Sequence, residues 1–364
     1  MRAMPRPVSN PPNPWNSTHV EWIGEPPDAQ IEIFEEEARS IVSENDSPDI
    51  PFRFSVNPYR GCLHACAYCY ARPTHQYLGY GAGTDFDRKI VVKVNAPELL
   101  EQELCSKRLR GQSIVFSGVT DPYQPIEASY RITRRCLEAI QKSDVAVGVI
   151  TKSCLIRRDI DLLSALAREG RATVYTSLAF ADAETARLIE PSTPSPALRI
   201  ETLRALAAAG IPTGLALAPV IPGLNDHEIP RLLRMAREAG ATRAFMTLLR
   251  LPAEVLPVFE ERLQAAFPLR AAKIFNRLRQ MRGGKVHDPR FGRRMEGSGE
   301  WWETVSKLFE IERRALGYNS VDEEECSAGK SPRYPTPPAP VARQTTLFEI
   351  EGFSRQNRSS LKSS

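Results

Sequence analysis

The chain has 364 residues, of which 42% are hydrophobic and 25% are charged, which is the composition of an ordinary globular protein. Basic residues outnumber acidic residues by 48 to 44, and a net charge of +4 is too small to indicate a nucleic-acid-binding protein by itself. No run approaches the ~20 apolar residues of a transmembrane helix, and the first residues lack the apolar core of a secretory signal. We therefore expect a cytoplasmic protein without a membrane span.

Residues 1–50 are expected to form an N-terminal extension, because they are rich in proline, which breaks regular helices and strands. Within the extension, the acidic segment at residues 31–42 predicts a short helix.

From residue 51, short β-branched runs alternate with segments of helical periodicity. Strands are predicted at residues 52–56, 90–94, 113–116, 145–150, 172–178, 213–220 and 245–251. Helices are predicted at residues 96–109, 130–142, 159–168, 196–209 and 229–239. Strands separated by helices favour a parallel sheet. When the run at 90–94 is set aside, six βα units remain, so the predicted fold is α/β, a partial (βα)6 TIM-like barrel over residues 51–255.

The C-terminal part is predicted to be helical and then disordered. Residues 256–320 form a helical extension in this prediction, with a basic, glycine-bearing segment at residues 283–294. Residues 321–364 are rich in glutamate, proline and serine, which is typical of a disordered tail.

Three cysteines, Cys62, Cys66 and Cys69, follow the first predicted strand of the barrel. Three is an odd number and the loop is tight, so they cannot easily pair off as disulfides. They are either incidental cysteines, or part of a structural zinc site, or ligands of a [4Fe–4S] cluster with one open iron. The zinc interpretation lacks a second pair of cysteines, since every other cysteine stands alone in the sequence.

The spacing C-x3-C-x-Tyr-C, with Tyr68 before Cys69, resembles the signature of radical S-adenosylmethionine (radical SAM) enzymes. The resemblance implies that Cys62, Cys66 and Cys69 hold a [4Fe–4S] cluster and that Tyr68 lies near the adenine of S-adenosylmethionine. It further implies reductive cleavage of that cofactor to a 5′-deoxyadenosyl radical, with flavodoxin or ferredoxin as electron donor. The superfamily has the same six-unit partial barrel. The stretch from about residue 51 to 127 resembles the branch named after DNA repair photolyases, which is related to spore photoproduct lyase.

The second barrel strand is followed by Gly118, Thr120 and Asp121. The superfamily holds the methionyl amino group at this point, usually with a Gly-Gly-Glu pattern that this sequence lacks. By resemblance, Thr120 and Asp121 are the polar groups available for that contact. The alternative is an ordinary turn at the start of a helix.

The next two strands end at Lys152, Ser153 and Ser177. By resemblance these polar residues contact the ribose or the carboxylate of the cofactor. The alternative is that they cap the helices that follow. Cys154 is a candidate hydrogen-atom donor, although most lone cysteines have no redox role.

The substrate is left open by the sequence. Spore photoproduct lyase uses a cysteine near the end of its second strand, and residues 116–121 contain none, so repair of the spore photoproduct itself is not expected. Repair or modification of a nucleic acid is one hypothesis. The alternative is an iron–sulfur redox sensor or nucleic-acid-binding protein without turnover, which would form no 5′-deoxyadenosine.

One further hypothesis concerns the C-terminal tail. The segment Gln344–Phe348 resembles the Gln-x-x-Leu-Phe peptides by which bacterial repair and replication proteins dock on the sliding clamp. A flexible tail can present adjacent apolar anchors to a groove, so a sliding clamp is an expected partner.

Overall fold

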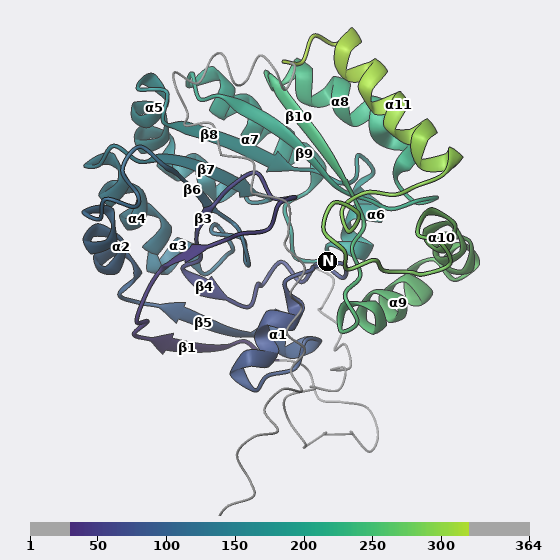
Figure 1. Ribbon diagram of the computed structural model, residues 1–364, viewed down its shortest axis with the longest axis horizontal. Helices are drawn as coiled ribbons and strands as arrows, with labels where there is room; N and C mark the ends of the chain where they lie inside the picture. The colour runs from purple at the N-terminus through teal and green to yellow at the C-terminus, as the bar shows by residue number, and fades with distance from the viewer. Residues whose placement is uncertain (1–29, 320–364) are drawn as a thin grey trace, which may run out of the picture. The chain divides into compact units, whose positions relative to one another are not determined.

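The computed structural model describes residues 30–319, which form two sheets with helices around them (Figure 1). The main sheet has seven strands in the order β10-β9-β8-β7-β6-β3-β2. Their bounds are Val42–Glu44 (β2), Phe54–Val56 (β3), Ser113–Phe116 (β6), Ala146–Thr151 (β7), Ala172–Ser177 (β8), Thr213–Val220 (β9) and Arg243–Leu248 (β10).

Six neighbouring strands of this sheet, β3 and β6 to β10, are parallel. Helices that follow these strands include α4 (Ile132–Gln141), α5 (Ile160–Arg168), α7 (Pro196–Ala208) and α8 (Ile229–Glu238). Buried and half-buried residues alternate along β7, as expected of a strand whose two faces differ. The predicted α/β fold with six parallel units is therefore confirmed, and the carboxyl ends of these strands share one rim.

A second, three-stranded sheet contains β1 (Glu32–Glu36), β4 (Tyr59–Arg60) and β5 (Lys89–Lys93). The helix predicted at residues 31–42 is wrong, because this segment contains β1, which pairs in parallel with β5. The pairing places Glu32 opposite Lys89 and Glu36 opposite Lys93, so unlike charges face each other across the strands. Backbone pairing and these cross-strand charges override the helical preference of an acidic segment. Residues 42–44 likewise form β2, which extends the main sheet antiparallel to β3.

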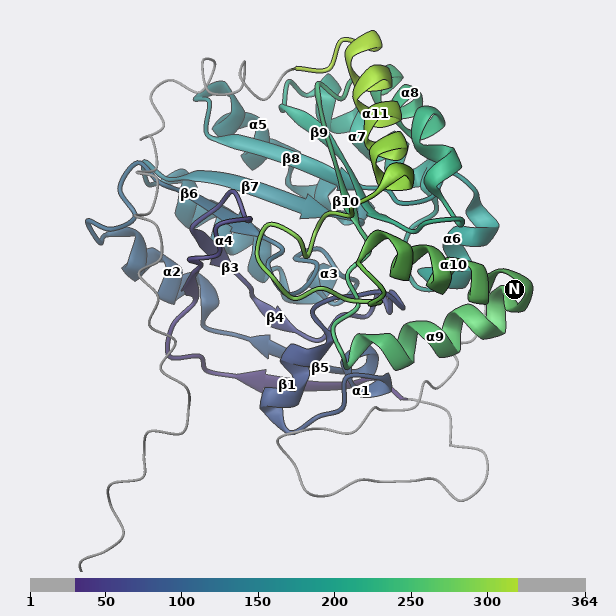
Figure 2. The ribbon, with the colours of Figure 1, turned by 45° about the vertical axis from the view of Figure 1, so that its right-hand side comes forward.

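The C-terminal helices share a core with the barrel. They are α9 (Val255–Ala266), α10 (Pro268–Met281) and α11 (Glu300–Ala315). One hydrophobic cluster contains Leu217 and Leu248 of the strands together with Phe259 and Phe309 of the helices. The loop between α10 and α11 returns to the end of β10, where the Leu248 amide donates to the Met295 carbonyl at 2.9 Å (Figure 2).

Short helices and turns occupy the remaining connections. These are α1 (Thr84–Arg88), α2 (Ala96–Leu104), α3 (Glu127–Tyr130), α6 (Ala183–Ile189) and the 3-10 helices η1 (Arg72–Leu78), η2 (Cys154–Asp159) and η3 (Asp226–Glu228). No helix among residues 30–319 is long and apolar enough to cross a membrane. The predicted disordered tail and the Gln344–Phe348 segment lie outside the described residues.

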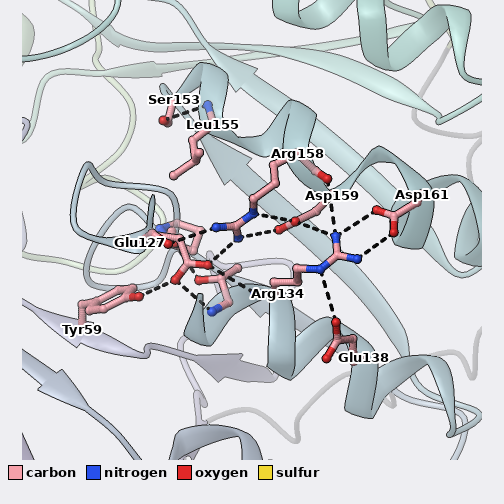
Figure 3. Close-up of polar contacts among 11 residues, drawn as sticks. Tyr59, Glu127, Arg134, Glu138, Ser153, Leu155, Arg158, Asp159 and Asp161 are labelled. Atoms are coloured by element: carbon pink, nitrogen blue, oxygen red, sulfur yellow. Dashed lines mark hydrogen bonds and ion pairs between the residues drawn. The ribbon is translucent and has the colours of Figure 1, made fainter. Parts of the chain in front are cut away.

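A buried charge network, made of Glu127, Arg134, Arg158 and Asp159, joins α3, α4 and η2 (Figure 3). The Glu127 and Asp159 side chains are fully buried, and each pairs with Arg158, at 2.6 and 2.8 Å. Arg134 pairs with Asp159 at 3.0 Å, and the Tyr59 hydroxyl donates to Glu127. Every charge of the network therefore has a partner of opposite sign, which is the condition for burying charge without a large penalty.

Candidate active site

The cysteine loop begins at Gly61, immediately after β4. Gly61 has φ +74°, and a Cβ atom there would lie 2.7 Å from the Lys89 carbonyl oxygen, so only glycine fits. The next amide, that of Cys62, donates to the Phe86 carbonyl at 2.9 Å. Helix α1 and the start of β5 thus fix the position of the first cysteine.

Two buried polar side chains hold the rest of the loop. Gln124 accepts from the Leu63 amide at 2.9 Å and donates to the Gly61 carbonyl at 3.1 Å. Arg72 donates to the Cys66 carbonyl from Nη2 at 2.9 Å and pairs with Asp87 at 2.8 Å. The sequence analysis singled out neither residue. Both act on the backbone of the loop, so the thiols stay available for other bonds.

The three thiols are close enough to influence one another. Burial raises the pKa of Cys62 well above its usual value, and the charges of Asp121, Cys69 and Cys66 raise it further. Burial also raises the pKa of Cys66, to about 12, although Lys152 partly opposes the rise. The thiolates are therefore disfavoured unless a cationic centre lies among them, which is the environment that a bound metal supplies.

Three clustered thiols are the donor set that a [4Fe–4S] cluster requires of the protein. Among residues 30–319, no three side chains of His, Cys, Asp or Glu are grouped so that they could hold one metal ion. In a [4Fe–4S] cluster each thiolate bonds to a different iron, so three thiolates stand farther apart and leave one iron open. Cys62, Cys66 and Cys69 are free thiols, and their spacing in the sequence is C-x3-C-x2-C.

Tyr68 and Lys152 lie together beside Cys66. The Lys152 Nζ atom is 5.7 Å from the centroid of the Tyr68 ring, and the Tyr68 hydroxyl donates to Glu190. Burial by itself would lower the pKa of Lys152, but the charges of Cys66 and Glu190 outweigh it and the pKa is raised. A retained ammonium group therefore stands next to the cysteine loop.

Glu190 and Arg199 form a buried ion pair that the sequence analysis missed. Burial alone would raise the pKa of Glu190, but Arg199 and Lys152 lower it, so the carboxylate keeps its charge. Arg199 also donates to the Ser177 carbonyl at 3.2 Å, which connects the end of β8 to this pair. Tyr68, Lys152 and Ser177 thus belong to one polar cluster.

Gly118 lies against the cysteine loop from the end of β6. Its carbonyl accepts from the Tyr70 hydroxyl at 3.1 Å, and the adjacent Val119 amide donates to Asn57 Oδ1 at 2.7 Å. Ser117, just before it, has φ +109°, a conformation that non-glycine residues adopt only under strain. Strained backbone of this kind concentrates at functional sites.

Asp121, Thr120 and Ser153 already have protein partners. Asp121 accepts from the Thr151 hydroxyl at 2.7 Å and the Lys152 amide at 2.8 Å, and it lies 3.4 Å from His64 Nδ1. Burial would raise the pKa of Asp121, but His64 and these donors lower it to about 2. The Thr120 hydroxyl donates to the Tyr59 carbonyl at 3.2 Å. Ser153 caps η2 by accepting from the Leu155 amide, the role described by the helix-capping alternative.

The family model described as "Radical SAM superfamily" matches residues 56–236. An uncharacterized protein of Mycobacterium tuberculosis is 40% identical over 195 residues, which cover 53% of this chain and 57% of the relative. The chain thus spans little more than half the length of the curated relatives that match it first.

Two other relatives extend the comparison. An uncharacterized protein of Methanocaldococcus jannaschii is 32% identical over 200 residues, which cover 55% of this chain and 72% of the relative. The Radical SAM Nalpha-GlyT isomerase of Pseudomonas phage M6 is 27% identical over 225 residues, which cover 61% of this chain and 45% of the relative.

Among solved structures, a spore photoproduct lyase mutant has the same fold. The TM-score is 0.55 with 17% sequence identity, and the match covers 82% of this chain and 85% of that chain. The family match and the three free cysteines after the first barrel strand lead to one conclusion: the chain belongs to the Radical SAM superfamily.

Proposed function

We propose that the chain binds a [4Fe–4S] cluster through Cys62, Cys66 and Cys69 and reductively cleaves S-adenosylmethionine. The observation that carries this proposal is the set of three mutually influencing thiols on a loop whose backbone is held by Gln124 and Arg72. When bound, the cluster and the cofactor together supply a 5′-deoxyadenosyl radical. The loop's own contribution is to present three thiols from a rigid backbone.

In this proposal, the polar cluster beside the loop holds S-adenosylmethionine. Tyr68 offers an aromatic face. Lys152 offers an ammonium group that makes no hydrogen bond to another of the described residues. Gly118 follows β6 and Ser177 ends β8, the two strands on either side of β7. We assign Asp121, Thr120 and Ser153 to positioning instead, because their side chains already bond to the protein.

The reaction requires an electron and a reducing compartment. We propose that flavodoxin or ferredoxin supplies the electron and that the protein works in the cytoplasm. The described cysteines are free thiols, which suits a reducing environment.

For the substrate class, we propose a nucleic acid that is modified or repaired. The support is indirect: one relative is named as a radical SAM isomerase of a phage, and the fold matches a lyase bound to a dinucleoside spore photoproduct. A sliding clamp bound by Gln344–Phe348 would bring such an enzyme to DNA.

The test is anaerobic reconstitution with iron and sulfide, followed by dithionite and S-adenosylmethionine, with chromatography for 5′-deoxyadenosine. Formation of this product is expected from the reconstituted chain and not from the unreconstituted one. A reconstituted, reduced protein that forms none would support the redox-sensor alternative instead.

A further inference from the structure

Three basic side chains gather at the carboxyl end of β10. Arg250 follows this strand, Arg282 follows α10, and His287 lies in the loop between α10 and α11. The Arg250 guanidinium carbon is 5.6 Å from the centroid of the Tyr70 ring. Because Tyr70 directly follows Cys69, this cation cluster of Arg250, Arg282 and His287 flanks the cysteine loop.

The cation cluster is held by the fold of the loop. Arg282 is only 6% exposed, and it donates to the Val286 carbonyl at 2.9 Å and to the Arg294 carbonyl at 3.3 Å. The loop is tied to β10 by the bond from the Leu248 amide to the Met295 carbonyl. These contacts fix Arg282 and the loop that carries His287 against the end of the strand.

The nearby carboxylates are already occupied. Asp49 pairs with Arg294 at 2.5 Å, and Asp288 pairs with Arg290 at 2.5 Å. Within residues 30–319, Arg250 has neither an ion pair nor a hydrogen bond, and the buried Nε atoms of Arg250 and Arg282 and Nδ1 of His287 have no partner. Four arginines therefore face two carboxylates.

The electrostatic environment agrees with this count. Burial lowers the pKa of Arg250, and the charge of Arg294 lowers it further, although Tyr70 and Asp49 oppose this. Burial lowers the pKa of Arg282 to about 10; Asp288 opposes this and Arg250 adds to it. Burial and the charges of Arg282 and Arg250 also lower the pKa of His287. The two arginines thus repel each other and are only partly screened, and His287 is favoured in its neutral form beside them.

An oxyanion would relieve this repulsion. Buried charge is unfavourable unless it is paired, and guanidinium groups match phosphate oxygens with several donors at once. A single carboxylate would neutralise only one of the two arginines, whereas a phosphate group carries up to two negative charges and offers more acceptor oxygens. Tyr70 is 47% exposed, and Arg250 and His287 are half-buried, so the cluster reaches solvent, from which a ligand can enter.

We propose that Arg250, Arg282 and His287 form an oxyanion site that binds a phosphate group of the substrate beside the cysteine loop. This inference rests on the proposed function, since it assigns a feature of the substrate that the cysteine loop would act on. The phosphate can come from a free phosphate monoester or from the phosphodiester backbone of a nucleic acid.

The test measures thermal unfolding of the full, anaerobically reconstituted chain at matched ionic strength. One arm titrates inorganic phosphate and the other titrates a single-stranded DNA oligonucleotide. The test variant is Arg250→Gln. The matched control is Arg293→Gln, which removes the same charge from an exposed position in the loop between α10 and α11. Arg282 is not changed, because its bonds to two carbonyls hold the loop.

We expect a ligand to raise the unfolding midpoint of the wild type and of Arg293→Gln. Arg250→Gln should weaken the ligand about tenfold or more, because a charged hydrogen-bond donor is lost. Without ligand, its midpoint should equal or exceed that of the wild type, because an unpaired buried cation has been removed. A response to both probes assigns the site to the nucleic-acid backbone, and a response to phosphate alone assigns it to a monoester.

Two results would overturn the inference. One is that neither probe stabilises the wild type, and the other is that Arg250→Gln responds as the wild type does. Formation of 5′-deoxyadenosine by the wild type is measured separately, without either probe. A chain that forms this product and ignores both probes would refute the phosphate site and leave the proposed radical chemistry standing.

Discussion

The buried charge network around Arg158 and the cation cluster around Arg250 are built from similar residues with opposite outcomes. In the network, Arg134 and Arg158 face the buried carboxylates Glu127 and Asp159, and each charge has a partner (Figure 3). In the cluster, Arg250 has no carboxylate partner among the described residues. The first arrangement joins α3, α4 and η2 to one another, whereas the second leaves positive charge uncompensated next to the cysteine loop.

The difference separates the charges that stabilise this fold from the charges that are available to a ligand. The paired charges of the network lie on α3, α4 and η2, the elements that follow β6 and β7. Unpaired charges lie at the end of β10, on the side of the exposed Tyr70 ring. Breaking a buried pair should therefore lower the free energy of unfolding, whereas removing an unpaired cation should weaken ligand binding.

The largest expected effect on stability is that of Arg158→Met. It leaves the fully buried Glu127 with one fewer cationic partner, and breaking a buried pair typically costs about 3–5 kcal/mol. Urea unfolding measures the change. The control is Arg157→Met, since Arg157 is exposed and should change the free energy of unfolding by less than about 0.5 kcal/mol. Equal, small losses for both variants would remove the distinction between the two regions.

A smaller effect is expected from Asp49→Asn, which breaks the pair with Arg294 at the edge of the cation cluster. Burial would raise the pKa of Asp49, but the hydrogen bonds from Arg294 and Gly292 lower it below its usual value. The carboxylate therefore stabilises the fold above its ordinary pKa of about 4, and this contribution is lost as the pH falls through the lower folded value.

Asp49→Asn should thus cost about 1 kcal/mol at pH 7 and nothing at strongly acidic pH. Unfolding of the wild type and the variant across this pH range measures the difference. A difference that persists unchanged in acid would show that the ionised carboxylate is not the cause. The variant should also bind phosphate more tightly at the cation cluster, because a competing anion is gone.

The smallest effect is expected from Asp161→Ala at the outer edge of the charge network. Asp161 pairs with Arg134 at 2.7 Å, but its side chain is 59% exposed. Exposed pairs contribute about 1 kcal/mol or less, and salt screens them. Unfolding at low and high salt should show a loss that shrinks as salt is added. A salt-independent loss as large as that of Arg158→Met would contradict the assignment of stability to the buried members.

The sequence predicted the parts of this molecule that depend on local pattern. Alternating β-branched runs and helical periodicity identified all six parallel strands, and the spacing of three cysteines identified the loop. The acidic segment at residues 31–42 departs from its predicted helix because its conformation depends on a partner strand more than 50 residues away. Local propensity cannot report such a partner.

The missed site residues act over still longer separations. Tyr68 and Glu190 are 122 positions apart, and Gln124 reaches the Leu63 amide across 61 positions. One signal was present: Arg199 shares a face of α7 with Leu203 and Leu206, and a cation on an apolar stripe predicts a buried partner. For Asp121 and Ser153, the sequence placed the residues at the rim but did not reveal that their side chains were already bonded.

The most direct test of the account is the iron content of Cys66→Ala beside Cys105→Ala after anaerobic reconstitution. Cys105 is exposed and lies just after α2, so its removal should leave about four irons per chain and unchanged formation of 5′-deoxyadenosine. Cys66→Ala should lose both the iron and the product, because each thiolate holds one iron. A Cys66→Ala protein that retains about four irons per chain would contradict the assignment of the cysteine loop as the cluster site.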